Sequence, residues 1–510
     1  MSAGQHLPFQ TGSTIAMQCD YCVVGSGAGG AAAAITLARA GFVVVVCEAG
    51  PWKDPEDYPW SMLGTMREMF DDWGTLVATG ESIIPVVQAS LVGGTPVINS
   101  AIVVRTPGDV LREWRDEHGL GDTFDDNAIG TAQDQIEREL QVQPTDWTIA
   151  GRASDLMLQG LRKLKIEAHP ITRNVAHCKG AMQCLQGCRN RSKQTANIVW
   201  MRELMHDRGG SVLSCAPVQR VAIAHGRATG VSGRFRHPQT RQAGAKFEIQ
   251  ARLGVILAAS ATGTGPLLQR SGVRLPALGK YFRGHPGAGV VGVYPDPVNM
   301  HTGPSQATAS MHHRLDHHIK LESLSLPLEL FAARVGGAGT ALTRKLASTS
   351  HCAMWVTAVR AQAEGTVRQT WWGGRSVHYT PTQRDLHSLR TGTKILARAH
   401  FEMGATKVWP GVVGLPAELG PDDVDCLDHA PLDNRAWTWV LSHLFGGAVL
   451  GGDPNRSVVG PDLHVRGVRN LHVVDAAALP TTLGVNPQHT IMAVAMVTAA
   501  RLVQQRPDTN

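Results

Sequence analysis

The sequence predicts an α/β protein whose parallel sheet belongs to a discontinuous domain, with an α+β domain carrying an antiparallel sheet inserted into it. Three observations lead to this prediction. A buried strand, a glycine-rich turn, a helix and a second buried strand follow one another within residues 22–48. Two further apolar strands, at 253–259 and 470–475, each lead into a turn and a helix. Between these two strands, residues 276–435 combine strand-like alternation with polar loops.

Composition excludes several classes of protein. The chain has 510 residues, of which 43% are hydrophobic and 18% charged, which is typical of a globular protein with a sizeable core. The net charge of +6 is spread without a long run of one sign, so we predict no nucleic-acid partner. The longest apolar run, residues 22–47, is broken by Arg39 and five glycines, so we predict no transmembrane segment.

The compartment is predicted from the cysteines and from the start of the chain. Nine cysteines in 510 residues are too sparse for a disulfide framework, which favours a reducing compartment. Residues 1–13 contain neither a basic region nor an apolar stretch of the kind found in secretory signals. We therefore expect a cytoplasmic protein.

The first βαβ unit is the clearest local pattern. Residues 22–24 are a short apolar strand, residues 30–39 are rich in alanine and favour a helix, and Gly41 ends that helix. The β-branched run at 42–47 predicts the next buried strand, which ends at Glu48.

The turn of this unit carries a nucleotide-binding pattern. Gly25, Gly27 and Gly30 form G-x-G-x-x-G directly after the strand, and Glu48 follows at the end of the next strand. In such a turn the first glycine permits the tight bend, the second admits the pyrophosphate, and the third lets helix and strand pack closely. The carboxylate of Glu48 would accept hydrogen bonds from ribose hydroxyls. The unit therefore predicts a Rossmann-like dinucleotide site, but its spacing does not separate FAD from NAD.

The remaining pieces of the domain lie far apart. The strand at 253–259 precedes a helix expected at 265–269, and the strand at 470–475 precedes a long apolar helix expected at 490–503. Within the inserted part, residues 287–294 are the clearest strand.

Four ordered segments resemble the glucose-methanol-choline (GMC) family of flavoprotein oxidoreductases, and the resemblance covers most of the chain. They are the βαβ unit; residues 93–99 (GGTPVIN) with Arg105, Thr106, Pro107 and Trp114; residues 255–272; and a C-terminal set comprising His443, Gly451–Pro454, Ser457–Val459, Gly467–Asp475, Pro480, Gly484, Asn486–Gln488 and Thr490. Two departures are Ser260, where the family often has glycine, and residues 445–451 (FGGAVLG), where it usually has Gly-Thr-Cys-Arg-Met-Gly.

The resemblance implies the domain organisation and the cofactor. An FAD-binding domain is expected over 15–115, 178–275 and 436–505, a connecting helical segment over 116–177, and a substrate-binding domain over 276–435. FAD contacts are expected at Gly25, Gly27, Ala28, Gly30, Glu48, Ala49, Gly93, Gly94, Asn99, Val218, Ala259, Asp475, Ala476, Asn486, Pro487 and Thr490.

The implied activity is oxidation of an alcohol to a carbonyl by hydride transfer to flavin N5. The resemblance makes His443 the general base and Asn486 its partner, and an imidazole suits this task because its pKa lies near neutrality. The alternative is that His443 is an ordinary core histidine and that Asn486 only turns the chain before Pro487. We expect His489, at the first turn of the last helix, to lie apart from the site.

The substrate and electron acceptor stay open at this point. The Cys-rich segment and residues 378–410 are similar to the bacterial long-chain or cyclic alcohol oxidases and dehydrogenases, which implies a hydrophobic or cyclic secondary alcohol. A sugar is the alternative substrate. Oxygen, a quinone or a carrier protein would accept the electrons. The competing functions are an FAD-containing lyase without net redox chemistry and a non-catalytic nucleotide-binding protein.

Two weaker patterns concern metals. Cys178, Cys184 and Cys188 form C-x5-C-x3-C, for which we predict a structural or redox-inert loop, with iron-sulfur ligation as the alternative. His313 and His317 would be an i, i+4 imidazole pair in a helix, but no carboxylate pattern completes a site, so we predict a solvated loop and no metal centre.

Overall fold

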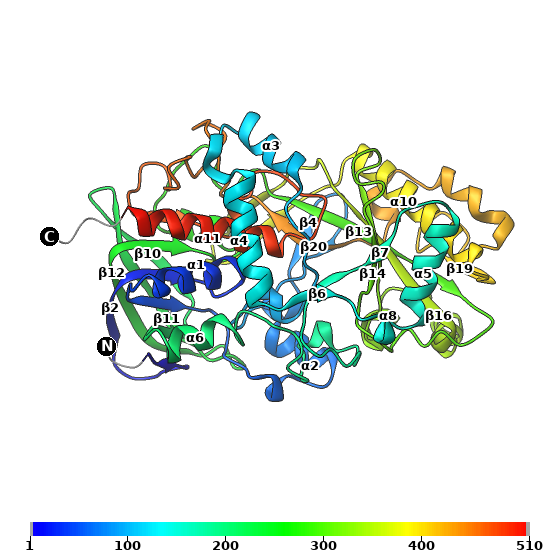
Figure 1. The fold of residues 1–510 in the computed structure, drawn as a ribbon, viewed down its shortest axis with the longest axis horizontal. Helices are drawn as coiled ribbons and strands as arrows, with labels where there is room; N and C mark the ends of the chain where they lie inside the picture. The colour runs from blue at the N-terminus through cyan, green and yellow to red at the C-terminus, as the bar shows by residue number, and fades with distance from the viewer. Residues whose placement is uncertain (1–3, 506–510) are drawn as a thin grey trace.

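A computed structural model describes residues 4–505, so the first three residues of the N-terminal stretch considered above lie outside the described part. The molecule is elongated and has two lobes side by side along its longest axis (Figure 1). Each lobe packs its own hydrophobic core against its own sheet. No helix within residues 4–505 combines the length and hydropathy needed to cross a membrane.

The sheet of the first lobe has the parallel core that the sequence predicts. The order β1-β9-β3-β2-β12 is parallel throughout, β21 joins β12 in parallel, and β11 and β10 extend the sheet antiparallel. Its strands are β1 (His6–Leu7), β2 (Ile15–Val24), β3 (Val44–Cys47), β9 (Ser211–Leu213), β10 (Val218–Ala224), β11 (Arg227–Arg236), β12 (Ala243–Leu257) and β21 (Leu471–Val473).

The sheet of the second lobe is antiparallel, in the order β19-β13-β16-β15-β14-β7, with β20 also paired to β13. Its strands are β7 (His169–Pro170), β13 (Arg283–Val293), β14 (Thr308–Ser310), β15 (Ile319–Ser323), β16 (Cys352–Val359), β19 (Lys407–Trp409) and β20 (Val440–Phe445). Two small sheets contain β4 (Val77–Thr79), β5 (Ile84–Pro85), β17 (Thr366–Gln369) and β18 (Arg375–His378), and β6 (Val142–Pro144) with β8 (Thr172–Asn174).

The helices complete the layers. They are α1 (Ala28–Arg39), α2 (Met62–Met69), α3 (Gly108–Asp116), α4 (Asp126–Glu139), α5 (Arg152–Lys163), α6 (Trp200–His206), α7 (Thr264–Arg270), α8 (Leu328–Ala332), α9 (Gly339–Ala347), α10 (Gln383–Glu402) and α11 (Gln488–Gln504). In the first lobe α1 packs against α11, which packs against α4; in the second lobe α5 and α10 pack on β16 (Figure 1).

The predicted α/β class is confirmed, and the expected elements differ from the observed ones mainly at their ends. The strand expected at 22–24 begins at Ile15, because residues 15–19 also pair with residues 247–251. The helix expected to begin at Thr490 starts at Gln488, directly after Pro487. The domain boundaries stay predictions. Although residues 436–505 are expected in the FAD-binding domain, their strand β20 pairs with β13 in the second sheet.

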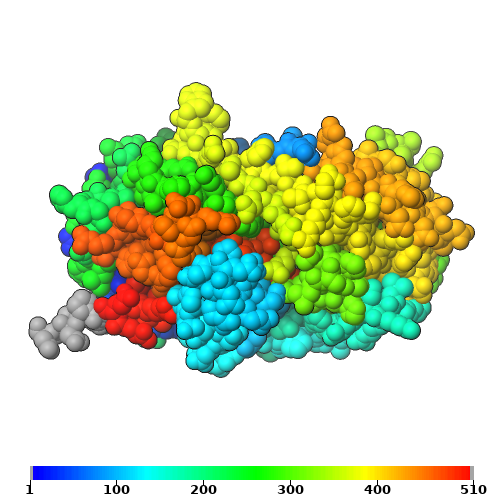
Figure 2. All heavy atoms as spheres, turned by 90° about the horizontal axis from the view of Figure 1, so that it is seen from above, coloured from blue at the N-terminus to red at the C-terminus, as the bar shows by residue number. Residues whose placement is uncertain are grey.

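The two lobes are held together near α3. Asp109 forms ion pairs with Arg314 and Arg360 at 2.9 and 3.2 Å, and Arg360 also pairs with Glu113 at 2.7 Å. Figure 2 shows the cyan segment that contains α3 and α4 between the orange and red C-terminal part and the yellow and green second lobe. This junction lies beside the loop before α11, because Arg314 also donates to the carbonyl oxygen of Leu483 at 2.7 Å.

Candidate active site

The three glycines of the turn between β2 and α1 have different surroundings. Gly25 has a φ of +95°, and a Cβ there would lie 2.2 Å from the carbonyl oxygen of Ala258. A Cβ on Gly30 would lie 1.9 Å from the carbonyl oxygen of Gly25, so the helix packs directly on the turn. A Cβ on Gly27 would meet only the Cα of Gly94, at 3.8 Å. The space beside Gly27 is therefore open to a ligand.

The N-terminus of α1 is free of protein capping groups. Gly27 is its N-cap residue without a side-chain hydrogen bond, and the first turn contains no acidic residue. The first N–H groups of a helix have no partner within the helix and lie at the positive end of its dipole. This end of α1, together with the open space at Gly27, fits the pyrophosphate of a dinucleotide.

Glu48 is buried at the end of β3 and holds the turn in place. Its Oε2 accepts hydrogen bonds from the Ser26 N–H at 2.9 Å and the Ser26 hydroxyl at 2.7 Å, and its Oε1 accepts from the Gly50 N–H at 2.9 Å. Burial raises the pKa of this carboxyl, and the three donors oppose the rise. Because a carboxylate has about four lone-pair positions, one stays available for a ribose hydroxyl.

The second predicted motif lies against this turn. Gly93 and Gly94 have φ of +98° and +63°, and a Cβ on Gly94 would lie 2.5 Å from the Cα of Gly27. The Gly93 N–H donates to the Ser26 hydroxyl at 3.1 Å. Asn99 donates to the side chain of Gln488, the first residue of α11, at 2.5 Å. The structure thus brings together three segments that are distant in the sequence.

Asp475 has protein partners for both of its carboxylate oxygens. Oδ2 accepts from the Ser260 N–H at 2.8 Å and the Thr264 hydroxyl at 2.5 Å, and Oδ1 accepts from the Ala477 N–H at 2.8 Å. Burial raises the pKa of Asp475 to about 6, and the hydrogen bonds oppose this rise. Ser260 has a φ of +79°, the left-handed region that favours glycine, which explains why the resemblance expects glycine there.

The other expected cofactor contacts occupy the ends of elements around the same turn. Ala28 begins α1, Ala49 is exposed directly after Glu48, Val218 begins β10, Ala259 and Ala476 follow β12 and β21, and Pro487 and Thr490 lie at the start of α11. The Thr490 hydroxyl lies 2.8 Å from that of Thr106, which ties α11 to the segment after Asn99.

The structure brings the two expected catalytic residues together. His443, on β20, has its Nε2 at 3.3 Å from the Asn486 amide nitrogen. His489 lies elsewhere: it is fully buried, with its Nε2 3.4 Å from the carbonyl oxygen of Gln133. Burial lowers the pKa of His443 to about 4; the neighbouring Glu322 opposes this shift.

Three residues that the sequence did not single out surround this pair. The Nδ1 atoms of His285 and His443 lie 3.2 Å apart, and the Gly484 N–H donates to His285 Nε2 at 3.0 Å. Lys320 and Glu322, two residues apart on β15 and therefore on the same face, form a buried ion pair at 2.6 Å. Lys320 also donates a hydrogen bond to the Asn486 side-chain oxygen.

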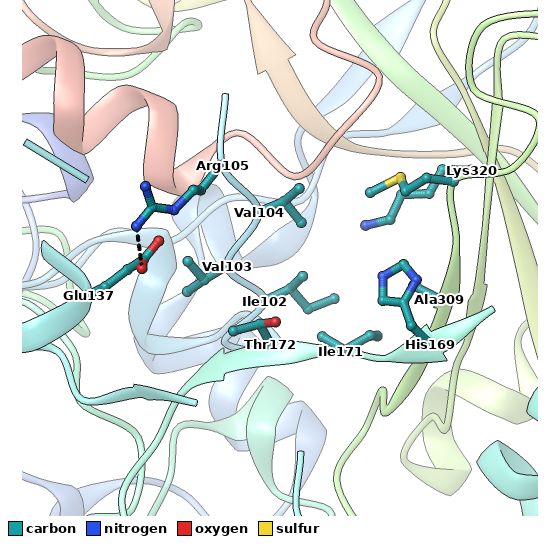
Figure 3. Close-up of a pocket in the computed structure, with 11 residues that line it drawn as sticks. Ile102, Val103, Val104, Arg105, Glu137, His169, Ile171, Thr172, Ala309 and Lys320 are labelled. Carbon is teal, nitrogen blue, oxygen red and sulfur yellow. Dashed lines mark hydrogen bonds and ion pairs between the residues drawn. The ribbon is translucent and has the colours of Figure 1, made fainter. Parts of the chain in front are cut away.

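A cavity of about 320 Å³ lies beside Lys320. Figure 3 shows Arg105 and Glu137 at one end and Lys320 and His169 at the other, with apolar side chains between them. Its lining comprises Ile102, Val103, Val104, Arg105, Glu137, His169, Ile171, Thr172, Ala309, Met311 and Lys320. Lys320 lines the cavity and also contacts Asn486, so this one side chain connects the cavity to the His443–Asn486 pair.

The three clustered cysteines contact a buried arginine. Cys178, Cys184 and Cys188 carry free thiols. Arg173 donates to the sulfur of Cys184 at 3.2 Å and to that of Cys178 at 3.6 Å. Over residues 4–505, the three sulfurs do not gather into a compact set of metal ligands. The iron-sulfur alternative stays untested, but two of its candidate ligands already accept hydrogen bonds from a cation.

The histidine pair at 313 and 317 differs from expectation. The segment is a series of turns, and the Asp316 carboxylate lies 2.8 Å from His313 Nδ1 and 3.8 Å from His317 Nε2. The expectation that no carboxylate joins these histidines is therefore wrong: three possible ligand atoms lie within 4.8 Å of one another. The sequence pattern missed Asp316 because only the turn brings it between the two rings.

Comparisons with known proteins agree with this geometry. Two family models described as GMC oxidoreductase match residues 66–287 and 362–495. A GMC-type oxidoreductase of Mycobacterium tuberculosis is 33% identical over 489 residues, covering 95% of this chain and 76% of that protein. A long-chain-alcohol oxidase of Arabidopsis thaliana is 25% identical, covering 98% of this chain and 69% of that protein.

Solved structures share the fold at low sequence identity. Pyridoxine 4-oxidase from Mesorbium loti has a TM-score of 0.70 at 16% identity, covering 95% of this chain and 99% of its own. A formate oxidase variant of Aspergillus oryzae has a TM-score of 0.75 at 15% identity, covering 97% and 99%. Together with the matched segments and the 33% identical relative, these likenesses lead to one conclusion: the chain belongs to the GMC oxidoreductase family and is an FAD-dependent oxidoreductase acting on CH–OH groups.

Proposed function

We propose that the protein oxidises a hydrophobic alcohol at the His443–Asn486 pair, with FAD held by the turn at Gly25–Gly30, Glu48, residues 93–99 and the start of α11. The open space beside Gly27 and the uncapped end of α1 support this placement of the dinucleotide. When bound, FAD supplies the two-electron acceptor for the hydride of the carbinol carbon.

His443 has the properties of a general base in this proposal. Burial lowers its pKa to about 4, so its imidazole is neutral at pH 7 and one of its two ring nitrogens is unprotonated. The Asn486 amide nitrogen lies 3.3 Å from Nε2, where it would hold the substrate oxygen as its proton leaves. Because the side-chain oxygen of Asn486 accepts a hydrogen bond from Lys320, the NH2 group of Asn486 points to His443.

The single observation that carries the proposal is this imidazole–amide pair, which Lys320 connects to a cavity with both apolar and polar walls. Six of the lining residues are apolar: Ile102, Val103, Val104, Ile171, Ala309 and Met311. These six side chains could contact the hydrocarbon part of a hydrophobic alcohol, while the ionisable residues of the lining lie at the two ends of the cavity. Long-chain-alcohol oxidases among the relatives support the same substrate class and support oxygen as the electron acceptor.

Anaerobic bleaching of the flavin absorbance tests the proposal. Hydrophobic primary and secondary alcohols should bleach the holoenzyme, and glucose should not. His443→Ala should keep the flavin spectrum and slow bleaching by about 10²- to 10⁴-fold, the usual contribution of a general base.

His400→Ala is the matched control, since it removes a fully buried imidazole that stacks on Trp355 in the second lobe, away from the pair and from the FAD-binding segments. Equal bleaching rates in the wild-type protein and His443→Ala would contradict the assigned base. Turnover of substrate without any bleaching would favour the lyase alternative.

A further inference from the structure

Two cations are buried beneath the segment that carries Asn99. Arg173, on β8, is 1% exposed, and Lys193 is 2% exposed. The Arg173 Nε donates to the carbonyl oxygen of Ser100 at 3.1 Å. The Lys193 ammonium donates to the carbonyl oxygens of Val97 at 2.8 Å and Asn99 at 2.6 Å. These two side chains therefore hold the main chain of residues 97–100 by hydrogen bonds to its carbonyl oxygens.

The same two cations face Cys184. The second terminal nitrogen of Arg173 lies 3.2 Å from the Cys184 sulfur, and Lys193 donates to the Cys184 carbonyl oxygen at 2.8 Å. Across residues 4–505, neither cation forms an ion pair with a carboxylate. Lys193 keeps its ammonium bound to carbonyl oxygens although burial lowers its pKa to about 8. The two positive charges thus lack a conventional anion.

Burial of uncompensated charge is unfavourable by several kcal/mol per ion, so a partner of negative charge is expected nearby. A thiol is a weak acceptor, whereas a thiolate accepts charge-assisted hydrogen bonds from a guanidinium. Burial alone raises the pKa of the Cys184 thiol, but Arg173, then Lys193, and contacts from Ser305 bring it down to about 7. The Cys178 thiol shares the Arg173 guanidinium with this sulfur.

A metal ion is a poorer explanation for this loop. The terminal nitrogens of Arg173 donate to the sulfurs of both Cys178 and Cys184, so the guanidinium lies where a cation would bind these sulfurs. A second buried cation, Lys193, adds to the repulsion that any incoming metal would meet. The charges favour an anionic sulfur without a metal.

We propose that Cys184 is a resident thiolate that pairs with Arg173 and offsets part of the positive charge of Arg173 and Lys193, and that this cluster positions residues 97–100 against the cofactor. The Cys184 sulfur holds Arg173 and the Cys184 carbonyl oxygen holds Lys193, and the remaining donors of these two cations then fix the carbonyl groups of Val97, Asn99 and Ser100. Cys184 is thus a positioning residue. The positioning part rests on the proposed course of FAD along residues 93–99, whereas the thiolate part does not.

The ultraviolet absorbance of thiolates, followed as a function of pH on the folded holoenzyme, tests the charge directly. The wild-type protein should show a step near pH 7, below the ordinary cysteine range of about 8.5. Cys184→Ser should lose this step. Cys352→Ser is the matched control: Cys352 is buried in β16, and burial raises its pKa to about 11, so the step should persist. Absence of a near-neutral step in the wild-type protein would overturn the proposal even if no variant folds.

FAD affinity tests the positioning part. Cys184→Ser should raise the dissociation constant for FAD about tenfold, which corresponds to a loss of about 1.4 kcal/mol of binding free energy. Cys184→Asp, which returns a negative charge, should recover most of this loss. If the Asp and Ser variants bind FAD equally poorly, charge is not the reason and the positioning part is wrong. If the wild-type protein binds no FAD while the thiolate step persists, the proposed function fails and the thiolate assignment stands.

Discussion

A methyl group added at Gly30 should destabilise the fold, whereas one added at Gly27 should weaken cofactor binding, although both glycines lie in the same turn. In Gly30→Ala the new Cβ would lie 1.9 Å from the Gly25 carbonyl oxygen and 3.0 Å from the Ala258 Cβ, so main chain has to move. Overpacking of this kind costs about 1–3 kcal/mol, which exceeds the gain of up to about 1 kcal/mol from replacing a helical glycine. Gly30→Ala should therefore lower the free energy of unfolding.

Gly27→Ala should have the opposite profile. Gly27 has φ −69° and ψ −163°, which alanine adopts without strain, and its new Cβ would lie 3.8 Å from the nearest heavy atom. The free energy of unfolding of the apoprotein should change by less than about 1 kcal/mol. The methyl group occupies the space assigned to the pyrophosphate, and an overpacking cost of about 1–3 kcal/mol corresponds to an affinity for FAD that is weaker by about 5- to 150-fold.

Denaturant unfolding of the apoprotein and FAD titration followed by flavin fluorescence measure the two effects separately. Each variant is the control for the other, since both add the same methyl group three residues apart. Wild-type FAD affinity in Gly27→Ala would refute the placement of the dinucleotide. A wild-type unfolding midpoint in Gly30→Ala would refute the packing argument.

Two further predictions concern charge. Glu322 raises and Lys320 lowers the pKa of His443. Lys320→Met should therefore move the acid limb of the pH profile of flavin bleaching to higher pH, and Glu322→Gln should move it to lower pH, by about one pH unit each. Shifts of the same sign in both variants would contradict the arrangement. For Asp475, burial raises the pKa from 3.8 to about 6, so the folded protein binds more protons than the unfolded one between these values, and stability falls as pH rises through this window. Asp475→Asn should therefore flatten the slope of unfolding midpoint against pH between about 4 and 6; an unchanged slope would show that Asp475 titrates normally.

The dinucleotide turn was predictable from the sequence because its determinants are local. Gly25, Gly27, Gly30 and Glu48 lie within 24 consecutive positions, and strand, turn and helix each leave their own pattern there. The resemblance also pointed to His443 and Asn486, whose side chains the fold brings to 3.3 Å.

The buried charges were not predictable in the same way. Lys320 and Glu322 alternate with apolar residues on β15, a pattern typical of a strand with one face in water. In the protein that face is covered, and the two charges pair beside Asn486. Arg173 and Lys193 likewise resemble ordinary surface cations until the fold encloses them around Cys184.

The sequence by itself therefore determined the class of fold, the βαβ turn and the family resemblance, because periodicity and glycine spacing are properties of neighbouring residues. Only the tertiary structure decided which charged side chains are buried and what they face. Burial depends on distant segments meeting at one place, as β15, β20 and the loop before α11, up to 166 residues apart, do around His443.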